Sequence, residues 1–211
     1  MRRAAFLVAL VTAGCASSPW QKTESVPGGR LYIPKVYAPL LPGSIYPDRK
    51  AAVPAKRRPA LIVVCPEKGD CRKDEILEQA AQRAMVVLIL THPASALQKI
   101  DLLRTRAEAS AANTGWLLVQ PDEDFLRRWM QAGASGQAAA VIGMPRHPSA
   151  PDPLPSYPSK TILIAALLSD APLEAKDGTV LKLYSPNKEG LLPREAFRDA
   201  VEWLAGALGA R

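Results

Sequence analysis

The chain has few of the residue types that carry catalysis or bind metal ions. Its 211 residues include two histidines and three cysteines, and 6% of them are aromatic. Three cysteines are too few for a disulfide-rich scaffold. The histidines, His92 and His147, lie far apart, and the carboxylates show no ligand spacing, so we predict no metal site. No glycine-rich phosphate loop follows any expected strand, and we therefore predict no nucleotide or other cofactor.

The overall composition is that of a folded protein. Hydrophobic residues make up 48% of the chain and charged residues 22%, which excludes a wholly disordered protein. The 20 prolines are concentrated in two places, with eight in residues 15–59 and six in residues 145–159. We expect the first segment to be extended, and the second to be an irregular loop that forms a short flap over one edge of a sheet.

The beginning of the chain has the pattern of an export signal. Met1-Arg2-Arg3 precedes an apolar run that ends at Ala13 and is too short to span a bilayer as a helix. Thr12-Ala13-Gly14-Cys15 resembles the lipobox of bacterial lipoproteins. That resemblance implies a signal peptide over residues 1–14 and a diacylglycerol on Cys15, hence a membrane anchor. Ala16 favours the outer membrane, on its periplasmic face or surface, over the inner membrane. The alternative is an ordinary signal peptide with an unmodified cysteine.

The positive charge is concentrated near this proposed anchor. The formal net charge is +7, yet residues 60–211 hold 17 basic and 18 acidic side chains. Residues 15–59 hold eight basic and two acidic side chains. A nearly neutral body argues against a nucleic-acid partner. We expect residues 15–59 to be a lipidated cysteine followed by a proline-rich basic tether and arm, in which Pro34 allows at most a short edge strand. Such an arm suits an anionic membrane or an envelope protein or polymer, and the alternative is a solvated linker.

From Ala60 onward, apolar runs alternate with segments of helical spacing. We expect six buried strands, at residues 60–65, 85–90, 116–119, 138–144, 161–167 and 179–184. We expect four helices, at residues 74–84, 94–112, 122–131 and 193–208. Alternation of this kind predicts an α/β protein, with a mostly parallel sheet of about six strands and helices on both faces, over residues 60–211.

Two cysteines remain if Cys15 carries lipid. Cys65 and Cys71 flank a turn-rich loop, and in an oxidising compartment they are a candidate disulfide. Their spacing is not that of a zinc site, and no second pair exists.

The order of elements over residues 60–208 resembles the α/β-hydrolase fold, especially its dienelactone-hydrolase-like members. In that family a loop corresponding to residues 66–71 supplies an oxyanion hole, and a G-x-S-x-G nucleophile elbow follows the strand at 116–119. A catalytic acid and a catalytic histidine follow the last two strands. This resemblance implies an esterase or peptidase fold with a site at the carboxyl edge of the sheet.

The family's catalytic residues are largely replaced in this chain. Gln120-Pro121-Asp122-Glu123-Asp124 stands at the elbow, with Asp122 at the expected nucleophile position, although an acid that opens a helix is usually a cap. Asp170 suits the acid position, or else is an ordinary turn residue. The segment from Tyr184 to Gly190 resembles the family's histidine segment, with Glu189 in place of histidine. A carboxylate is a poor substitute for imidazole near neutral pH.

Two further residues are weaker candidates for catalysis. Gly133-Ala134-Ser135-Gly136-Gln137 begins like an elbow, but it lies between a helix and a strand, the reverse of the required order. His92 follows a strand at the carboxyl edge, and we interpret it, like His147, as an ordinary loop histidine.

Three functions fit this pattern. The first is a lipid-anchored, catalytically degenerate α/β-hydrolase-like protein that acts by binding or in envelope assembly. The second is an active hydrolase with an atypical site that draws on Asp122 or Ser135 with Asp170 and His92. The third is another open α/β binding module, flavodoxin-like or thioredoxin-like. The order of strands discriminates the third, because a hydrolase-type sheet places the strand at 60–65 beside the strand at 116–119.

Overall fold

The computed structural model describes residues 18–35, 57–67, 71–91, 96–106, 108–131, 138–143, 161–166, 179–184 and 192–210. The predicted loop at 145–159 lies outside these ranges. The strands are β1 (Trp20–Val26), β2 (Gly29–Pro34), β3 (Arg58–Val64), β4 (Val86–Leu90), β5 (Ala109–Val119), β6 (Ala139–Ile142), β7 (Thr161–Ala166) and β8 (Thr179–Tyr184). The helices are α1 (Lys73–Gln82), the 3₁₀ turn η1 (Leu97–Lys99), α3 (Ile100–Arg104), α4 (Glu123–Gln131) and α5 (Arg194–Ala207).

The eight strands form one sheet in the order β1-β2-β4-β3-β5-β6-β7-β8. Every pair from β4 to β8 is parallel, whereas β2 is antiparallel to both β1 and β4. The mostly parallel sheet predicted from the sequence is therefore confirmed, and its six expected strands are β3 to β8. Because β3 pairs with both β4 and β5, the sheet meets the test for a hydrolase-type order.

The arm predicted over residues 15–59 is wrong for residues 20–34, which form a hairpin within the sheet. Pro27 and Gly28 occupy the two central positions of the turn, and Gly28 has φ +80°, as a type II turn requires. Gly29 then lies so close to β4 that a Cβ would be 2.0 Å from the Ile89 oxygen. The hairpin stays on the sheet because alternate residues of β2, Leu31 and Ile33, are buried in the core.

The long helix predicted over residues 94–112 is also wrong. The helical part ends at Arg104, and β5 begins at Ala109. The backbone N–H of Arg58 donates to the Glu108 oxygen at 2.9 Å, and Arg58 pairs with Ala109 across the ladder. Backbone pairing with a buried strand outweighs the few tenths of a kcal/mol per residue, roughly, by which the sequence favours helix. An irregularity follows in β5, where the Thr114 hydroxyl donates to the Ser110 oxygen at 3.0 Å.

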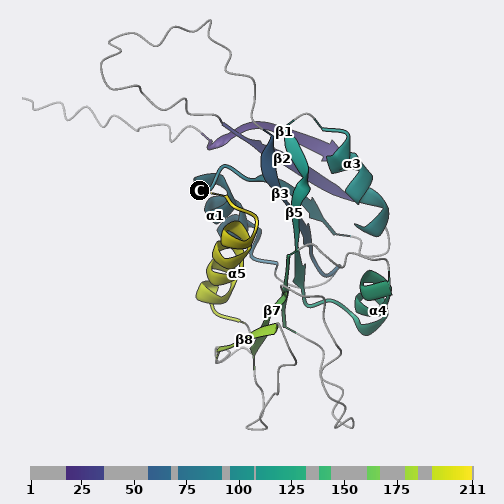
Figure 1. Ribbon diagram of the computed structural model, residues 1–211, viewed down its shortest axis with the longest axis vertical. Coiled ribbons are helices and arrows are strands. Elements are labelled where there is room, and N and C mark those ends of the chain that lie inside the picture. Colours follow the sequence, from purple (N-terminus) through teal and green to yellow (C-terminus); the bar gives the residue numbers. More distant parts are fainter. Residues whose placement is uncertain are drawn as a thin grey trace, which may run out of the picture.

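Helices cover both faces of the sheet, as predicted. Figure 1 shows α1 and α5 on one side, and α3 and α4 on the other. Ile76 of α1 and Phe197 of α5 belong to one buried cluster, whereas Leu103 of α3 and Trp129 of α4 belong to the other. The apolar runs of the sequence are therefore strands buried on both sides, and their carboxyl ends form the edge where sites of open α/β folds lie.

Candidate functional site

A disulfide closes the loop after β3. Cys65 and Cys71 are bonded, with Cα atoms 5.5 Å apart and exposures of 1% and 4%. The Cys65 N–H donates to the Leu90 oxygen at 2.8 Å, which places the bridge beside the end of β4. The candidate disulfide is thus present, and it ties the end of β3 to the start of α1 at Lys73.

Gln120 forms the sharp turn between β5 and α4. Its φ is +45°, a left-handed value that is uncommon for any residue except glycine. Its N–H donates to the Ile142 oxygen at 2.7 Å, so the strained turn is held against the end of β6. The exposed Gln120 side chain passes over Gly143, where a Cβ would lie 3.0 Å from the Gln120 Cγ. In α/β-hydrolases the nucleophile occupies such a strained strand-to-helix turn.

Asp122 lies two residues beyond this turn and caps α4. Its Oδ1 accepts a hydrogen bond from the Phe125 N–H at 2.6 Å, and its backbone oxygen accepts one from Leu126 at 3.0 Å. This is the pattern of an N-cap carboxylate, which satisfies a donor that the helix cannot. The structure therefore places Gln120 at the sharp turn after β5, and Asp122 at the start of α4.

The other residues singled out in the sequence fall outside the described part of the chain. They are Cys15, His92, Ser135, Asp170 and Glu189. Of the predicted catalytic residues, the described part of the chain therefore contains Asp122 alone. Within the ranges that it describes, no group of three or more histidine, cysteine or acidic residues is arranged to hold a metal ion.

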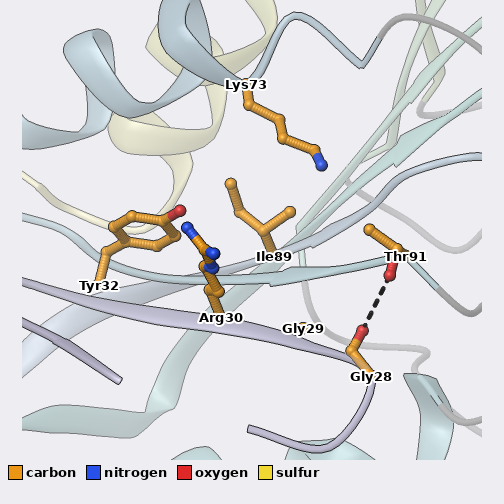
Figure 2. A pocket seen from close by; sticks show the side chains of 7 residues that line it. All are labelled: Gly28, Gly29, Arg30, Tyr32, Lys73, Ile89 and Thr91. Carbon is orange, nitrogen blue, oxygen red and sulfur yellow. Dashed lines mark hydrogen bonds between the residues drawn. The ribbon is translucent and has the colours of Figure 1, made fainter. Parts of the chain in front are cut away.

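A cavity of about 550 Å³ lies at the same edge of the sheet, between the β1–β2 turn, the end of β4 and the start of α1. We call it the Arg30–Lys73 groove. Figure 2 shows Arg30 and Tyr32 projecting from β2 and Lys73 reaching in from α1. The residues that line it are Gly28, Gly29, Arg30, Tyr32, Lys73, Ile89 and Thr91.

The lining of the groove is cationic, and hydrogen bonds hold its backbone in place. It contains two cations and no carboxylate. Thr91 donates to the Gly28 oxygen twice, from its N–H at 3.0 Å and its hydroxyl at 3.3 Å, which fastens the hairpin turn to the end of β4. On the outer side, the Tyr32 ring makes an edge contact with Trp20, with ring centroids 5.4 Å apart. Sequence reasoning missed this groove because it assigned Arg30 and Tyr32 to an arm outside the domain.

Comparison with solved structures identifies the architecture. The structure superposes with a TM-score of 0.56 on the α/β hydrolase MGS-M1 from a Medee basin deep-sea metagenome library, covering 90% of this chain and 99% of that one at 12% identity. The chain has an α/β-hydrolase-like fold. Thermogutta terrifontis esterase 2, phosphonylated by sarin, is also similar, with 14% identity, a TM-score of 0.47 and coverage of 85% of this chain and 90% of that one. No protein-family model matches the chain, and neither does any curated protein.

The α/β-hydrolase-like fold removes the third functional class considered above. A flavodoxin-type sheet has five strands in the order 2-1-3-4-5. Here an antiparallel hairpin extends the sheet beyond β4, and β7 and β8 extend it beyond β6.

In the described parts of the chain, no helix is both long and apolar enough to cross a membrane.

Proposed function

We propose that this chain is a lipid-anchored protein of the bacterial cell envelope whose α/β-hydrolase-like domain binds a ligand and does not hydrolyse one. The observation that carries the proposal is the residue at the β5–α4 turn. Gln120 holds the strained position at which this fold presents its nucleophile. A neutral carboxamide has no ionisable hydroxyl or thiol, and therefore cannot form the acyl-enzyme on which such hydrolases depend.

Two further features support a binding role. Asp122 is the predicted acidic residue closest in sequence to this turn. Its carboxylate already accepts a hydrogen bond from the Phe125 N–H, and this contact stabilises α4. The sequence also has Glu189 where the resemblance implies a histidine. The Arg30–Lys73 groove meanwhile offers a concave surface of a size typical of ligand sites.

A fluorophosphonate probe tests the absence of a serine nucleophile. The full chain, solubilised in detergent, should remain unlabelled under conditions in which an added serine hydrolase is labelled completely. Labelling that disappears in the Ser135→Ala variant would overturn the proposal, and would establish the atypical hydrolase in its place. Labelling that persists in this variant would overturn it as well, with the site mapped by mass spectrometry.

The lipid anchor has a separate test. Cells fed an alkyne-tagged fatty acid should incorporate the tag into the protein, and the Cys15→Ala variant should lose it and leave the membrane fraction. Equal membrane partitioning of the two chains, without tag on either, would refute the anchor. The outer membrane is the expected destination, on the grounds of Ala16, and membrane fractionation on a density gradient tests it.

A further inference from the structure

The Arg30–Lys73 groove concentrates positive charge that the described structure does not neutralise. Arg30 and Lys73 come from different elements and are exposed, and among the described residues no ion pair joins either of them to a carboxylate. Glu75, in the first turn of α1, is held instead by Arg194 at 3.1 Å and by Arg72 at 3.7 Å. The groove therefore attracts anions.

The donors in the groove suit a phosphate group. An arginine offers several N–H donors in a planar fork that matches phosphate oxygens, and a lysine adds a compact charge. The Tyr32 hydroxyl lines the same wall, and Figure 2 shows it beside the Arg30 guanidinium, on the side away from Lys73. Gly28 presents backbone without a side chain, so a ligand can approach it closely. The Thr91 hydroxyl is occupied with the Gly28 oxygen and serves to hold the turn.

The chain between the proposed anchor and the groove is short. Only residues 16–19 lie between Cys15 and Trp20, where β1 begins. A fully extended chain covers at most about 3.6 Å per residue, so Trp20 lies within about 18 Å of Cys15. Trp20 in turn touches Tyr32, which lines the groove. An acyl chain on Cys15 would keep the groove within reach of lipid headgroups.

We infer that the Arg30–Lys73 groove binds the phosphate of anionic phospholipid headgroups, and so docks the domain on the membrane to which Cys15 attaches it. This inference rests on the proposed anchor for its geometry. The contact with the headgroup is noncovalent and consists of charge-assisted hydrogen bonds from Arg30 and Lys73. It would hold the carboxyl edge of the sheet, with Gln120, in a defined orientation to the membrane.

Vesicle sedimentation with residues 16–211, the mature chain without Cys15, tests the groove apart from the anchor. This chain retains every described element, and any binding it shows does not depend on Cys15. It should partition to phosphatidylglycerol/phosphatidylethanolamine vesicles, and not to phosphatidylcholine/phosphatidylethanolamine vesicles. Arg30→Gln and Lys73→Gln should each lower the partition coefficient about fivefold, and the double variant about 25-fold, because a cation near an anionic surface contributes about 1 kcal/mol.

Arg128→Gln is the matched control. It removes the same charge from an exposed position on α4, on the opposite face of the sheet, where Arg128 Nε donates to the Asp124 oxygen. It should change the partition coefficient by less than about twofold. Tyr32→Phe removes one donor without changing charge, and should weaken binding to phosphatidylglycerol vesicles. Circular dichroism verifies that each variant is folded.

Four outcomes would overturn the inference. They are absence of vesicle binding by the chain with its native residues, binding by Arg30→Gln and Lys73→Gln as strong as that of the native chain, a loss in Arg128→Gln as large as theirs, and binding of soluble glycerol phosphate in place of vesicles. The last would assign the groove to a free phosphate compound. A failed anchor is recognised differently, by a missing fatty-acid tag on the full chain.

Discussion

Loss of the Cys65–Cys71 disulfide should lower the free energy of unfolding by about 2 kcal/mol. The two cysteines are six residues apart in sequence. In the chain-entropy model, a bridge that closes so short a loop reduces the entropy of the unfolded chain by about 7.5 cal/mol/K, which is about 2 kcal/mol at 25 °C. In the native state the Cys65 end of the loop is also held to β4, because the Cys65 N–H donates to the Leu90 oxygen.

Urea denaturation, followed by tryptophan fluorescence, measures the effect. With a slope of about 2 kcal/mol/M, the midpoint of the reduced chain should fall by about 1 M urea relative to the oxidised chain. Reduction leaves both side chains in place, so this comparison isolates the crosslink. The Cys65→Ala/Cys71→Ala variant should be less stable again, because it also removes two buried sulfur atoms.

Identical midpoints for the oxidised and reduced chains would refute this reasoning. Such a result would mean that the unfolded loop is already constrained without the bridge.

Vesicle binding by the Arg30–Lys73 groove is a second measurement of the effect of the bridge, because Lys73 follows Cys71 closely at the start of α1. Reduction should weaken vesicle binding if the bridge holds this start of the helix in position.

Three other perturbations separate backbone, cap and charge effects. Gly29→Ala should destabilise the chain by about 1–3 kcal/mol or more, because its Cβ would collide with the β4 backbone. Gly206→Ala should stabilise the chain by about 0.5–1 kcal/mol, because the position in α5 has open space around it and alanine favours helix over glycine. Urea midpoints of the two variants that move in the same direction would contradict this pair of predictions. Asp122→Ala should cost about 1 kcal/mol and Asp122→Asn much less, as measured by thermal unfolding, and a similar loss in both would argue against a capping role. The Lys22 ammonium, which bonds the Glu24 carboxylate, and the Arg106 guanidinium, 2.6 Å from it, hold the pKa of Glu24 below its usual range. A depressed pKa stabilises the fold above the unfolded-state pKa of about 4.3 and ceases to do so as pH falls through the folded-state value. The stability difference between the native chain and Glu24→Gln should therefore shrink in acid, and a difference that is constant with pH would exclude this linkage.

The sheet could be predicted from the sequence because burial on both faces leaves a local pattern. The runs that became β3, β4 and β6 are continuously apolar, and α5 shows helical spacing after Pro193. The disulfide could also be predicted from the sequence, because Cys65 and Cys71 flank a short loop. These features depend on residues that are close together in the chain.

The candidate site depended on contacts that no local pattern encodes. Residues 20–34 are so rich in polar residues and turn formers that the sequence pattern does not predict a buried strand there. Pairing with β4 nevertheless incorporates this segment into the sheet. The sharp turn after β5 lies at Gln120, two residues before the position expected from the sequence, Asp122. Gln120 has the polar character of an ordinary loop residue, and only its left-handed φ marks the turn. Which residue occupies such a turn is decided by where the neighbouring strand of the sheet ends.

The sequence by itself determined which segments are buried, and therefore that the chain folds as a mostly parallel sheet between helices. Periodicity of apolar residues is a one-dimensional signal, and burial is the property that it reports. Only the tertiary structure decided that Arg30 of β2 and Lys73 of α1 line one groove, and that Gln120 occupies the sharp turn between β5 and α4. Convergence of this kind depends on strand order and register, since residues distant in the chain become neighbours only when the sheet has assembled.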